Sequence, residues 1–292
     1  MDLPIPSTPC HVDVAGRRIT YDANGPGTLV LLLHGFPQTR LAWRSVVPLL
    51  SDRYRVVCPD LPGYGMSDRL GEGPEAFDKA CVASHLVDFM AALGHDRFAI
   101  VGHDRGALVA FRAALDHPDV VSHLGVLDVI PTADNWAALT GVGGVFAFHL
   151  YLLAQPSDLP ERLIGADPDT FFGHFLDGWT VVSGAVPHDV REQYLAAFRS
   201  PAAIRAVCDD YRASAFIDGI RDVENQARGR TLSMPTFAAW QDSGDYDLPF
   251  DPHPIWASWA PDLKTAVASC GHFLPEEAPE LVASNIRMLL ER

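Results

Sequence analysis

The chain has 292 residues, is 48% hydrophobic and 20% charged, and carries a formal net charge of −15 at pH 7. That length allows one large α/β domain with an insertion, or two small domains. The negative charge argues against nucleic acid and anionic membrane surfaces as partners, and no apolar stretch is long enough to span a membrane. Five scattered cysteines and a start without a signal-peptide pattern lead us to expect a cytoplasmic protein without disulfides or a zinc site.

The first half of the chain alternates between strand and helix patterns. Residues 11–21 are typical of a hairpin that turns at Ala15-Gly16-Arg17. Four short apolar runs are typical of strands buried on both faces: 28–33, 54–58, 98–101 and 124–130. The clearest amphipathic helix covers 76–93 and ends before Gly94. This alternation predicts the α/β fold class, with a mostly parallel, doubly wound sheet.

The pattern changes after Pro131, because residues 134–225 are helical, aromatic and interrupted by prolines. Two strand patterns and a last helix then follow, at 235–240, 263–268 and 277–290. We therefore predict a core formed by 1–133 and 226–292, with 134–225 inserted as a helical cap. Ligands of such sheets bind at the carboxyl ends of the strands, so an insertion that leaves from one of those ends would cover the site.

A turn flanked by glycines follows the strand predicted at 98–101, with the sequence Gly102-His103-Asp104-Arg105-Gly106. Gly-x-nucleophile-x-Gly between a strand and a helix is the nucleophile elbow of α/β-hydrolases, and here the central residue is Asp104. A carboxylate that attacks a saturated carbon forms a stable ester, whereas attack on an ester or amide would give a strained anhydride. The elbow therefore favours alkyl halides or epoxides as substrates. The structural alternative is that Asp104 only caps the helix that begins at Arg105.

Two further groups complete a predicted catalytic triad in the chain order of this fold, which is nucleophile, acid, histidine. His272 follows the last strand, and its neutral imidazole would activate the water that hydrolyses the ester on Asp104. Asp128 also follows a strand and is the preferred acid, because it would hold the His272 tautomer. Asp242 and Asp245, after the next strand, are rivals for that role.

An oxyanion hole is expected where the strand predicted at 28–33 ends in His34-Gly35-Phe36-Pro37. The backbone N–H of Phe36, together with that of Arg105, would face the tetrahedral intermediate that forms when water attacks the ester. His34 is expected to brace the loop and to take no part in catalysis.

Five segments resemble the haloacetate (fluoroacetate) dehalogenase family of the α/β-hydrolase superfamily: His34-Gly35-Phe36-Pro37-Gln38-Thr39, Gly102-His103-Asp104-Arg105-Gly106-Ala107, Leu115-Asp116-His117-Pro118, Asp210-Tyr211-Arg212-Ala213 and Gly271-His272-Phe273-Leu274-Pro275-Glu276-Glu277. The resemblance covers nearly the whole chain. It implies that Asp104 displaces halide from a 2-haloacid without a cofactor or metal, and that Arg105 binds the substrate carboxylate. By position, His149 and Tyr211 would hold the leaving halide. The resemblance also implies a homodimer.

Two positions depart from the resembled family. Leu108 stands where the family has a second carboxylate-binding arginine, and Leu150 stands where it has a tryptophan of the halide pocket. Each departure removes a polar contact of about 1–3 kcal/mol, so the pocket is expected to be more apolar and to suit a larger or uncharged substrate better than fluoroacetate. Arg40 is a candidate to supply the missing cation.

The alternatives are an epoxide hydrolase and a binding module without catalytic activity. An epoxide hydrolase would use the same triad but would need acidic donors for the leaving oxygen, usually two tyrosines, which would be Tyr211 with Tyr151 or Tyr194. A binding module is possible in principle because fold does not determine function. Four cap aromatics could line a dimer interface or pack the cap onto the core: Phe171, Phe172, Phe175 and Trp179.

Overall fold

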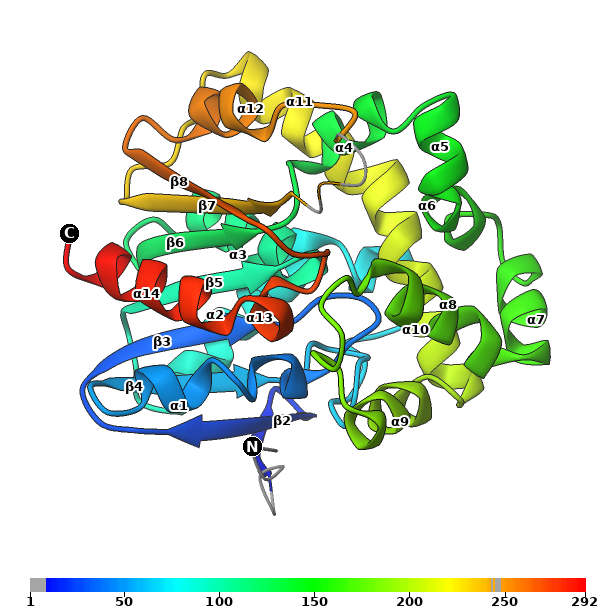
Figure 1. The fold of residues 1–292 in the computed structure, drawn as a ribbon, viewed down its shortest axis with the longest axis horizontal. Helices are drawn as coiled ribbons and strands as arrows, with labels where there is room; N and C mark the ends of the chain where they lie inside the picture. Colours follow the sequence, from blue (N-terminus) through cyan, green and yellow to red (C-terminus); the bar gives the residue numbers. More distant parts are fainter. Residues whose placement is uncertain (1–8, 243, 245–247) are drawn as a thin grey trace.

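The fold is built on one sheet with helices on both faces (Figure 1). The computed structural model describes residues 9–242, 244 and 248–292. In that part of the chain eight strands pair in the order β1-β2-β4-β3-β5-β6-β7-β8. β1 pairs antiparallel with β2, and β2 with β4, whereas the remaining pairs are parallel. The strands are β1 Cys10–Val14, β2 Arg17–Asn24, β3 Thr28–Leu33, β4 Tyr54–Pro59, β5 Phe98–His103, β6 Val121–Leu127, β7 Thr236–Gln241 and β8 Leu263–Ala268. The predicted α/β-hydrolase sheet is confirmed.

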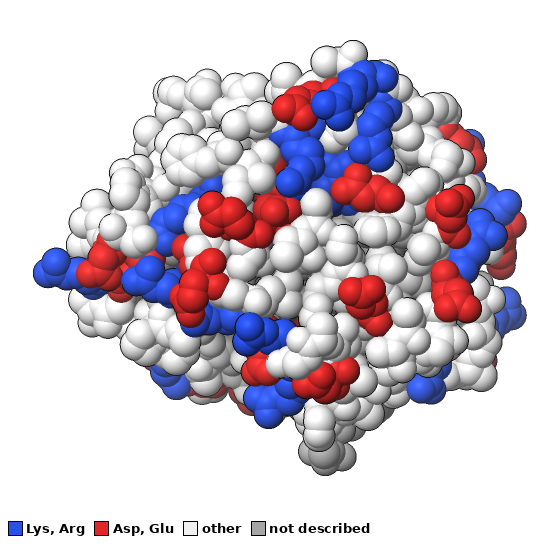
Figure 2. All heavy atoms as spheres, turned by 180° about the vertical axis from the view of Figure 1, so that it is seen from behind, with Lys and Arg blue, Asp and Glu red and all other residues white. Residues whose placement is uncertain are grey.

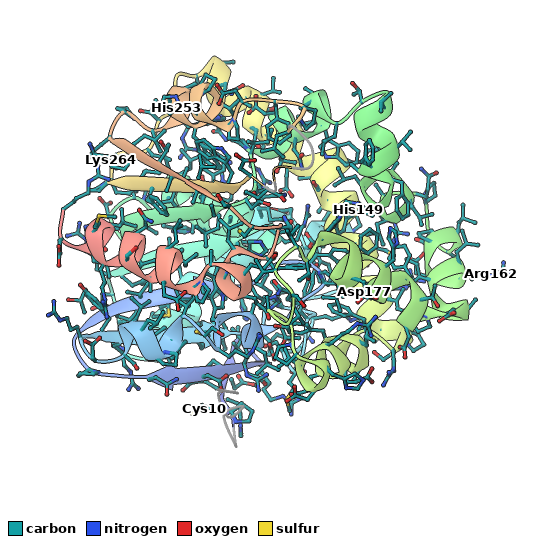
Figure 3. The ribbon with its side chains drawn as sticks, in the orientation of Figure 1. Cys10, His149, Arg162, Asp177, His253 and Lys264 are labelled. Atoms are coloured by element: carbon teal, nitrogen blue, oxygen red, sulfur yellow. The ribbon has the colours of Figure 1, made fainter. Side chains whose placement is uncertain are left out.

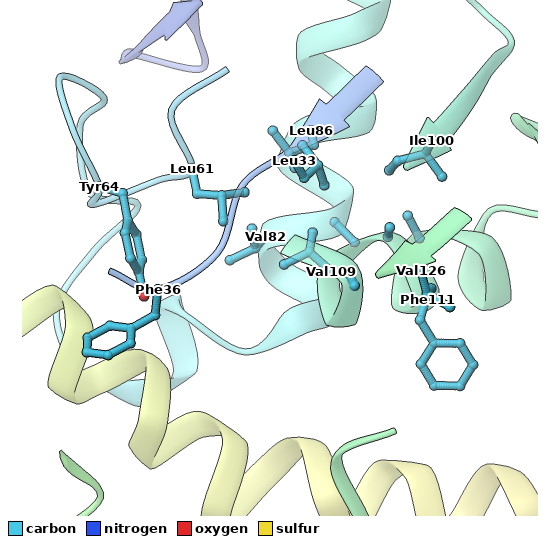
Figure 4. Close-up of a cluster of buried hydrophobic side chains, with 14 of the residues drawn as sticks. Leu33, Phe36, Leu61, Tyr64, Val82, Leu86, Ile100, Val109, Phe111 and Val126 are labelled. Atoms are coloured by element: carbon cyan, nitrogen blue, oxygen red, sulfur yellow. The ribbon is translucent and has the colours of Figure 1, made fainter. Parts of the chain in front are cut away.

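Each face of the sheet has its own hydrophobic core, which explains the continuous apolar runs in the sequence. Leu29, Leu31 and Leu33 of β3 pack into one core, and Val30 and Leu32 pack into the other. The first core lies under α2 (Lys79–Ala92), α3 (Arg105–Asp116) and α12 (Pro252–Trp259), and the second under α1 (Val47–Leu50), α13 (Leu274–Glu277) and α14 (Pro279–Leu290). Figure 4 shows the first core, with Phe36 at its edge beside the cap helices.

Helices fill the chain between β6 and β7, and those of residues 132–213 lie at one end of the sheet in Figure 1. They are α4 Thr132–Ala138, α5 Val142–Phe146, α6 Phe148–Leu153, α7 Leu159–Ala166, α8 Pro168–Trp179, α9 His188–Ala197, α10 Pro201–Ala213, the π-helical η3 Ser214–Asp218 and α11 Gly219–Ala227. Two short 3₁₀ helices lie elsewhere, η1 Arg40–Trp43 and η2 Pro74–Ala76. We propose that residues 134–225 act as the cap that the sequence suggests.

Of the element boundaries that differ from the predictions, three have a clear local cause. The strand predicted to reach residue 130 ends at Leu127, because Asp128 adopts a φ of 52° and turns the chain out of the sheet. The helix predicted from residue 76 begins as α2 after Asp78, whose carboxylate accepts hydrogen bonds from the N–H groups of Ala80 and Cys81. The helix predicted from residue 277 begins at Pro279, a residue suited to a first helical turn.

The four aromatic residues of α8 pack inside this single chain. Phe172 and Phe175 are buried, with ring centroids 5.8 and 5.3 Å from that of Phe36, and the Trp179 ring lies 6.2 Å from it. Phe171 packs against Phe172 and Phe175 at 5.2 Å. These contacts join the cap to the core, and the homodimer stays a prediction.

Two general features concern the charges on the molecular surface and the length and polarity of the helices. On the face seen in Figure 2, acidic and basic side chains are interspersed over the surface. Across the described ranges, no helix has both the length and the apolar character that crossing a bilayer requires.

Candidate active site

Asp104 occupies a strained turn between β5 and α3, with a φ of 49° that non-glycine residues rarely adopt. Three glycines make this turn possible by letting backbones approach closely. A Cβ atom on Gly102 would lie 2.3 Å from the carbonyl oxygen of Gly106, and one on Gly106 would lie 2.3 Å from that of His34. A Cβ atom on Gly35 would lie 2.4 Å from Oδ1 of Asp104 itself. The local sequence thus presents the carboxylate at the carboxyl end of the sheet.

The carboxylate of Asp104 contacts one of the two predicted oxyanion-hole donors. The backbone N–H of Phe36 donates a hydrogen bond to Asp104 Oδ1 over 2.7 Å. The other predicted donor, the N–H of Arg105, belongs to the first turn of α3, where helical N–H groups have no partner within the helix. The second carboxylate oxygen, Oδ2, faces His272.

The structure brings His272 and Asp128 together beside Asp104. His272 Nδ1 lies 2.6 Å from Asp128 Oδ2, and Nε2 lies 3.9 Å from Asp104 Oδ2, which exceeds hydrogen-bond distance. Hydrogen bonding to Asp128 places the proton on Nδ1, so Nε2 is an unprotonated acceptor. Within the described residues, Nε2 is buried and has no hydrogen-bond partner. This nitrogen is therefore placed to take a proton from a water molecule.

The pKa of His272 is set by two opposing effects. Burial lowers it, because the charged imidazolium is poorly solvated. The hydrogen bond to Asp128 and the charges of Asp128 and Asp104 raise it more, so the net pKa lies above the ordinary 6.5. The imidazolium that forms when His272 takes a proton is thereby stabilised.

Asp128 accepts two hydrogen bonds from Gln241, the last residue of the neighbouring strand β7. The Gln241 backbone N–H donates to Oδ1 over 2.8 Å, and its side-chain Nε2 donates to Oδ2 over 2.9 Å. The rival Asp242 instead accepts a hydrogen bond from the N–H of Gly244. Asp245 lies outside the described residues. Among the acids that the structure describes, Asp128 is the one that contacts Nδ1 of His272.

Glu277 organises the loop that carries His272, a role that the sequence analysis did not assign. Its carboxylate accepts hydrogen bonds from four backbone N–H groups at 2.7–3.1 Å, those of Val181, Val182, Gly271 and Phe273. The N–H of His272 donates to the carbonyl of Trp179, and Nε2 of His103 lies 2.7 Å from the carbonyl of His272. The loop that carries His272 is thus tied both to the cap and to β5. The sequence signal that could have indicated this role is the acidic pair Glu276-Glu277 shortly after His272.

His149 of α6 and Tyr211 of α10 face the same region from the cap, where Figure 3 labels His149. Their ring centroids are 5.7 Å apart and lie 5.9 and 5.5 Å from that of Phe36. Burial, together with the nearby His272 and Arg105, lowers the pKa of His149 to about 3. Burial and the charge of Asp104 raise the pKa of the Tyr211 phenol well above its usual value. Both groups are therefore neutral at pH 7, and each carries a proton that can be donated in a hydrogen bond.

The guanidinium of Arg105 is paired with Asp210 in the free protein. Nε lies 3.1 Å from Asp210 Oδ2, and Nη2 lies 2.6 Å from Oδ1 and 3.1 Å from the Asp210 carbonyl. The carbon at the centre of the guanidinium lies 4.3 Å from the centre of the Tyr211 ring. Lys79 also forms a salt bridge with Asp210. Arg105 is predicted to bind a substrate carboxylate, but in this structure it is already paired with a carboxylate of the protein.

The other tyrosines proposed for an epoxide hydrolase are occupied elsewhere. Tyr151 is partly exposed, and its O–H donates to the carbonyl of Leu139 over 2.7 Å. Tyr194 is buried, and its O–H donates to Glu276. Neither therefore forms a donor pair with Tyr211 in this structure.

Arg40, the candidate to replace the arginine for which Leu108 stands, is paired elsewhere, so that expectation is wrong. Its guanidinium forms ion pairs with Asp22 at 3.0 Å and with Asp60 at 2.9 Å. Leu108 and Leu150 are both buried apolar side chains. Within the described ranges, no cluster of histidine, cysteine, aspartate and glutamate side chains is arranged to hold a metal ion.

A mostly parallel sheet, an elbow that presents a carboxylate and a histidine–aspartate pair beside it agree with the class of α/β-hydrolases. Comparison with known families agrees with this. The model of the family described as alpha/beta hydrolase fold matches residues 28–279, so the chain belongs to that family.

The chain is similar to named hydrolases along nearly its whole length. A fluoroacetate dehalogenase from Burkholderia sp is 38% identical over 283 residues, which cover 96% of this chain and 92% of that protein. A soluble epoxide hydrolase from Corynebacterium sp. (strain C12) is 33% identical, and the match covers 92% of each. A Pseudomonas aeruginosa structure provisionally assigned as an epoxide hydrolase matches with a TM-score of 0.93 at 39% identity, over 100% of this chain and 98% of that chain. The resemblance predicted from the sequence is confirmed, and the chain is a hydrolase of this fold.

Proposed function

We propose that the protein hydrolyses the carbon–halogen bond of a small haloacid-type substrate through an ester on Asp104. The observation that carries this proposal is the placement of Asp104. One of its oxygens lies 3.9 Å from Nε2 of a histidine that Asp128 orients, and its charge acts on the Tyr211 phenol opposite. A carboxylate nucleophile, a base and neutral donors are the groups that displacement followed by ester hydrolysis requires.

In the first step, Asp104 Oδ2 attacks the saturated carbon as the bond to the halogen breaks. The halogen leaves with the bonding electrons as halide, and the His149 N–H and the Tyr211 O–H donate hydrogen bonds to it. Donors in a water-poor pocket stabilise developing negative charge far better than they would in bulk water. The carbon is left as an alkyl ester of Asp104.

In the second step, water attacks the carboxyl carbon of the Asp104 ester while His272 Nε2 accepts its proton. The negative charge develops on the oxygen that faces the N–H groups of Phe36 and Arg105. The intermediate then collapses, the bond between the carboxyl carbon and the substrate oxygen breaks, and His272 returns its proton to the departing alkoxide. The product alcohol leaves, and the carboxylic acid left at Asp104 loses its proton to water and becomes a carboxylate again.

The low pKa of His149 supports halide as the leaving group. A halide ion leaves without a proton, so a neutral imidazole that only donates a hydrogen bond is sufficient. An epoxide oxygen leaves as an alkoxide and needs a proton, which an imidazole with a pKa of about 3 does not carry at pH 7.

Epoxide hydrolysis is the second candidate, because Tyr211 is a protonated acid opposite Asp104. The similarity to a soluble epoxide hydrolase at 33% identity also supports it. Tyr211 would then have to give its proton to the leaving oxygen without a second tyrosine.

The test is to incubate the protein with chloroacetate, chloroacetamide, fluoroacetate and styrene oxide while halide and diol are measured. Halide release supports dehalogenation, and diol as the sole product favours the epoxide hydrolase. A His272→Gln variant should accumulate the ester, seen as a mass increase of the intact protein. The double variant with Asp104→Asn is the matched control and should stay unmodified. A turnover of Asp104→Asn close to that of the wild type would exclude the covalent route.

A further inference from the structure

Arg105 has its hydrogen-bonding capacity directed at the protein. Its guanidinium makes four hydrogen bonds, three with Asp210 and a long one of 3.5 Å with Ser214. The side chain is buried, and the residue is only 2% exposed. A guanidinium binds a carboxylate through two N–H groups on one edge of its plane, and here Asp210 occupies the edge formed by Nε and Nη2, while Nη1 makes the long contact with Ser214.

The charges around Arg105 also balance. Asp210 pairs with both Arg105 and Lys79, and Lys79 lies 3.6 Å from a second carboxylate, that of Asp218. This chain of ion pairs ends in Arg221, which contacts Asp218 at 3.8 Å and Asp78 at 2.7 Å. The connected group therefore holds three cations, Lys79, Arg105 and Arg221, and three carboxylates, Asp78, Asp210 and Asp218. We call these six residues the Asp210 cluster.

The nearby charges do not favour an anion either. Asp104 and Asp128 are two carboxylates beside His272. Arg44, a further buried cation, is paired with Glu276. A substrate carboxylate would thus approach the Asp104 carboxylate without an unpaired cation from Arg105 to offset their repulsion.

The position of Arg105 suits a different task. Its charge lies over the face of the Tyr211 ring, where a cation is attracted by the ring electrons. The same charge opposes the effect of burial and Asp104 on the phenol, and so makes the Tyr211 O–H a stronger donor. Asp210, the residue before Tyr211, holds the cation in this place.

We propose that the substrate of this site is an uncharged electrophile of the 2-haloamide type, and that Arg105 is a positioning residue for Tyr211 and does not bind a substrate carboxylate. This inference rests on the proposed hydrolysis through Asp104. It refines the haloacid-type substrate to one whose carbonyl group carries no charge.

The first experiment compares chloroacetamide with chloroacetate, which share the halogen and the reacting carbon and differ in charge. The kcat/KM for chloride release is measured for each compound and divided by its rate of reaction with free acetate, because the two differ in intrinsic reactivity. We expect the normalised value to be at least about tenfold higher for the amide than for the acid. The enzyme would then bind the transition state of the amide at least about ten times more tightly than that of the acid. Equal values, or a higher value for the acid, would overturn the inference.

The second experiment changes the charge of the Asp210 cluster. Asp210→Asn leaves one cation in excess, so the ratio of acid to amide kcat/KM should rise at least about tenfold. Asp209→Asn is the matched control, since the neighbouring carboxylate pairs with Arg212 at 2.8 Å and not with Arg105; its ratio should equal that of the wild type. A ratio that stays constant in Asp210→Asn contradicts the inference.

Lys79→Gln changes the same cluster in the opposite direction, and the ratio should fall. The ratio is taken within each variant, so a partly unfolded fraction cancels from it. If neither compound releases chloride and His272→Gln forms no adduct with either, the proposed function fails and the inference fails with it. If the adduct forms but the acid is preferred, only the inference about charge fails.

Discussion

Replacing Asp128 with asparagine should stop ester hydrolysis while the ester still forms. Asp128 Oδ1 accepts the Gln241 backbone N–H over 2.8 Å, and Oδ2 accepts His272 Nδ1–H over 2.6 Å. Oδ2 also accepts a hydrogen bond from the Gln241 side-chain amide over 2.9 Å, but that amide can turn to present its oxygen. An asparagine has one NH₂ group and must point it either at the Gln241 backbone N–H or at His272 Nδ1. The backbone N–H cannot reorient, whereas His272 can move its proton to Nε2. The variant should therefore favour the tautomer in which Nε2 is protonated and cannot act as a base.

The magnitude follows from the contacts that are lost. Restoring the active tautomer would turn the NH₂ group against the Gln241 N–H, and leaving buried donors unsatisfied costs about 1–3 kcal/mol. The imidazolium also loses its hydrogen bond to a charged partner, worth about 1.5–3 kcal/mol. The sum of about 2.5–6 kcal/mol corresponds to a fall of about 10²–10⁴ in the rate of ester hydrolysis.

The assay is rapid-quench measurement of halide and of intact protein mass. Asp128→Asn should release about one halide for each active site in a first phase and then turn over slowly. Asp242→Asn is the control, because that carboxylate contacts Gly244 and not His272, and it should keep its turnover within about twofold of the wild type. A loss smaller than about tenfold for Asp128→Asn, or a first phase slowed as much as steady turnover, would refute the assigned role of Asp128.

Three other predictions test the donors, the loop and the base. Tyr211→Phe removes one donor to the leaving group at about 1.5–3 kcal/mol, so the first phase of halide release should slow by about 10–150-fold; equal slowing of ester hydrolysis would contradict this. Glu277→Gln turns an NH₂ group toward backbone N–H groups and should lower the free energy of unfolding by about 1–3 kcal/mol in urea titration, and kcat more than KM; an unchanged kcat would leave Glu277 purely structural. His272 must be neutral to accept a proton and its pKa is raised, so kcat should fall as the pH decreases through a value above 6.5. The raised pKa also stabilises the folded protein. This stabilisation is fully present below pH 6.5 and is lost as the pH rises through the pKa of His272 in the folded state. Thermal melts of His272→Gln across that range should lack this pH dependence.

Local sequence patterns were sufficient for the sheet and for the order of the proposed triad. The apolar runs predicted strands because a strand buried on both faces has no polar side to display. Gly102, Asp104 and Gly106 predicted the elbow because the turn excludes a Cβ atom at both glycine positions, and the contacts of those positions agree. Such signals involve residues a few positions apart, so they can be read without knowing the fold.

The choice between Asp128 and Asp242 was harder, since both follow the end of a strand. The structure places Asp128 against His272 because its φ of 52° turns its side chain out of the sheet. The boundary at Leu127 was mispredicted for the same reason. The positive φ of Asp128 lacks the flanking glycines that mark the turn at Asp104, because it is imposed by the surrounding packing.

The sequence by itself determined the class of this protein, through an elbow with a carboxylate, a late histidine and an acid between them. Only the tertiary structure decided what each charge faces. Arg105 pairs with Asp210, which is 105 positions away, and Glu277 holds Val181 and Val182 across nearly a hundred residues. The physical reason is that a buried charge is stabilised by partners in space, and folding alone decides which distant residues become those partners.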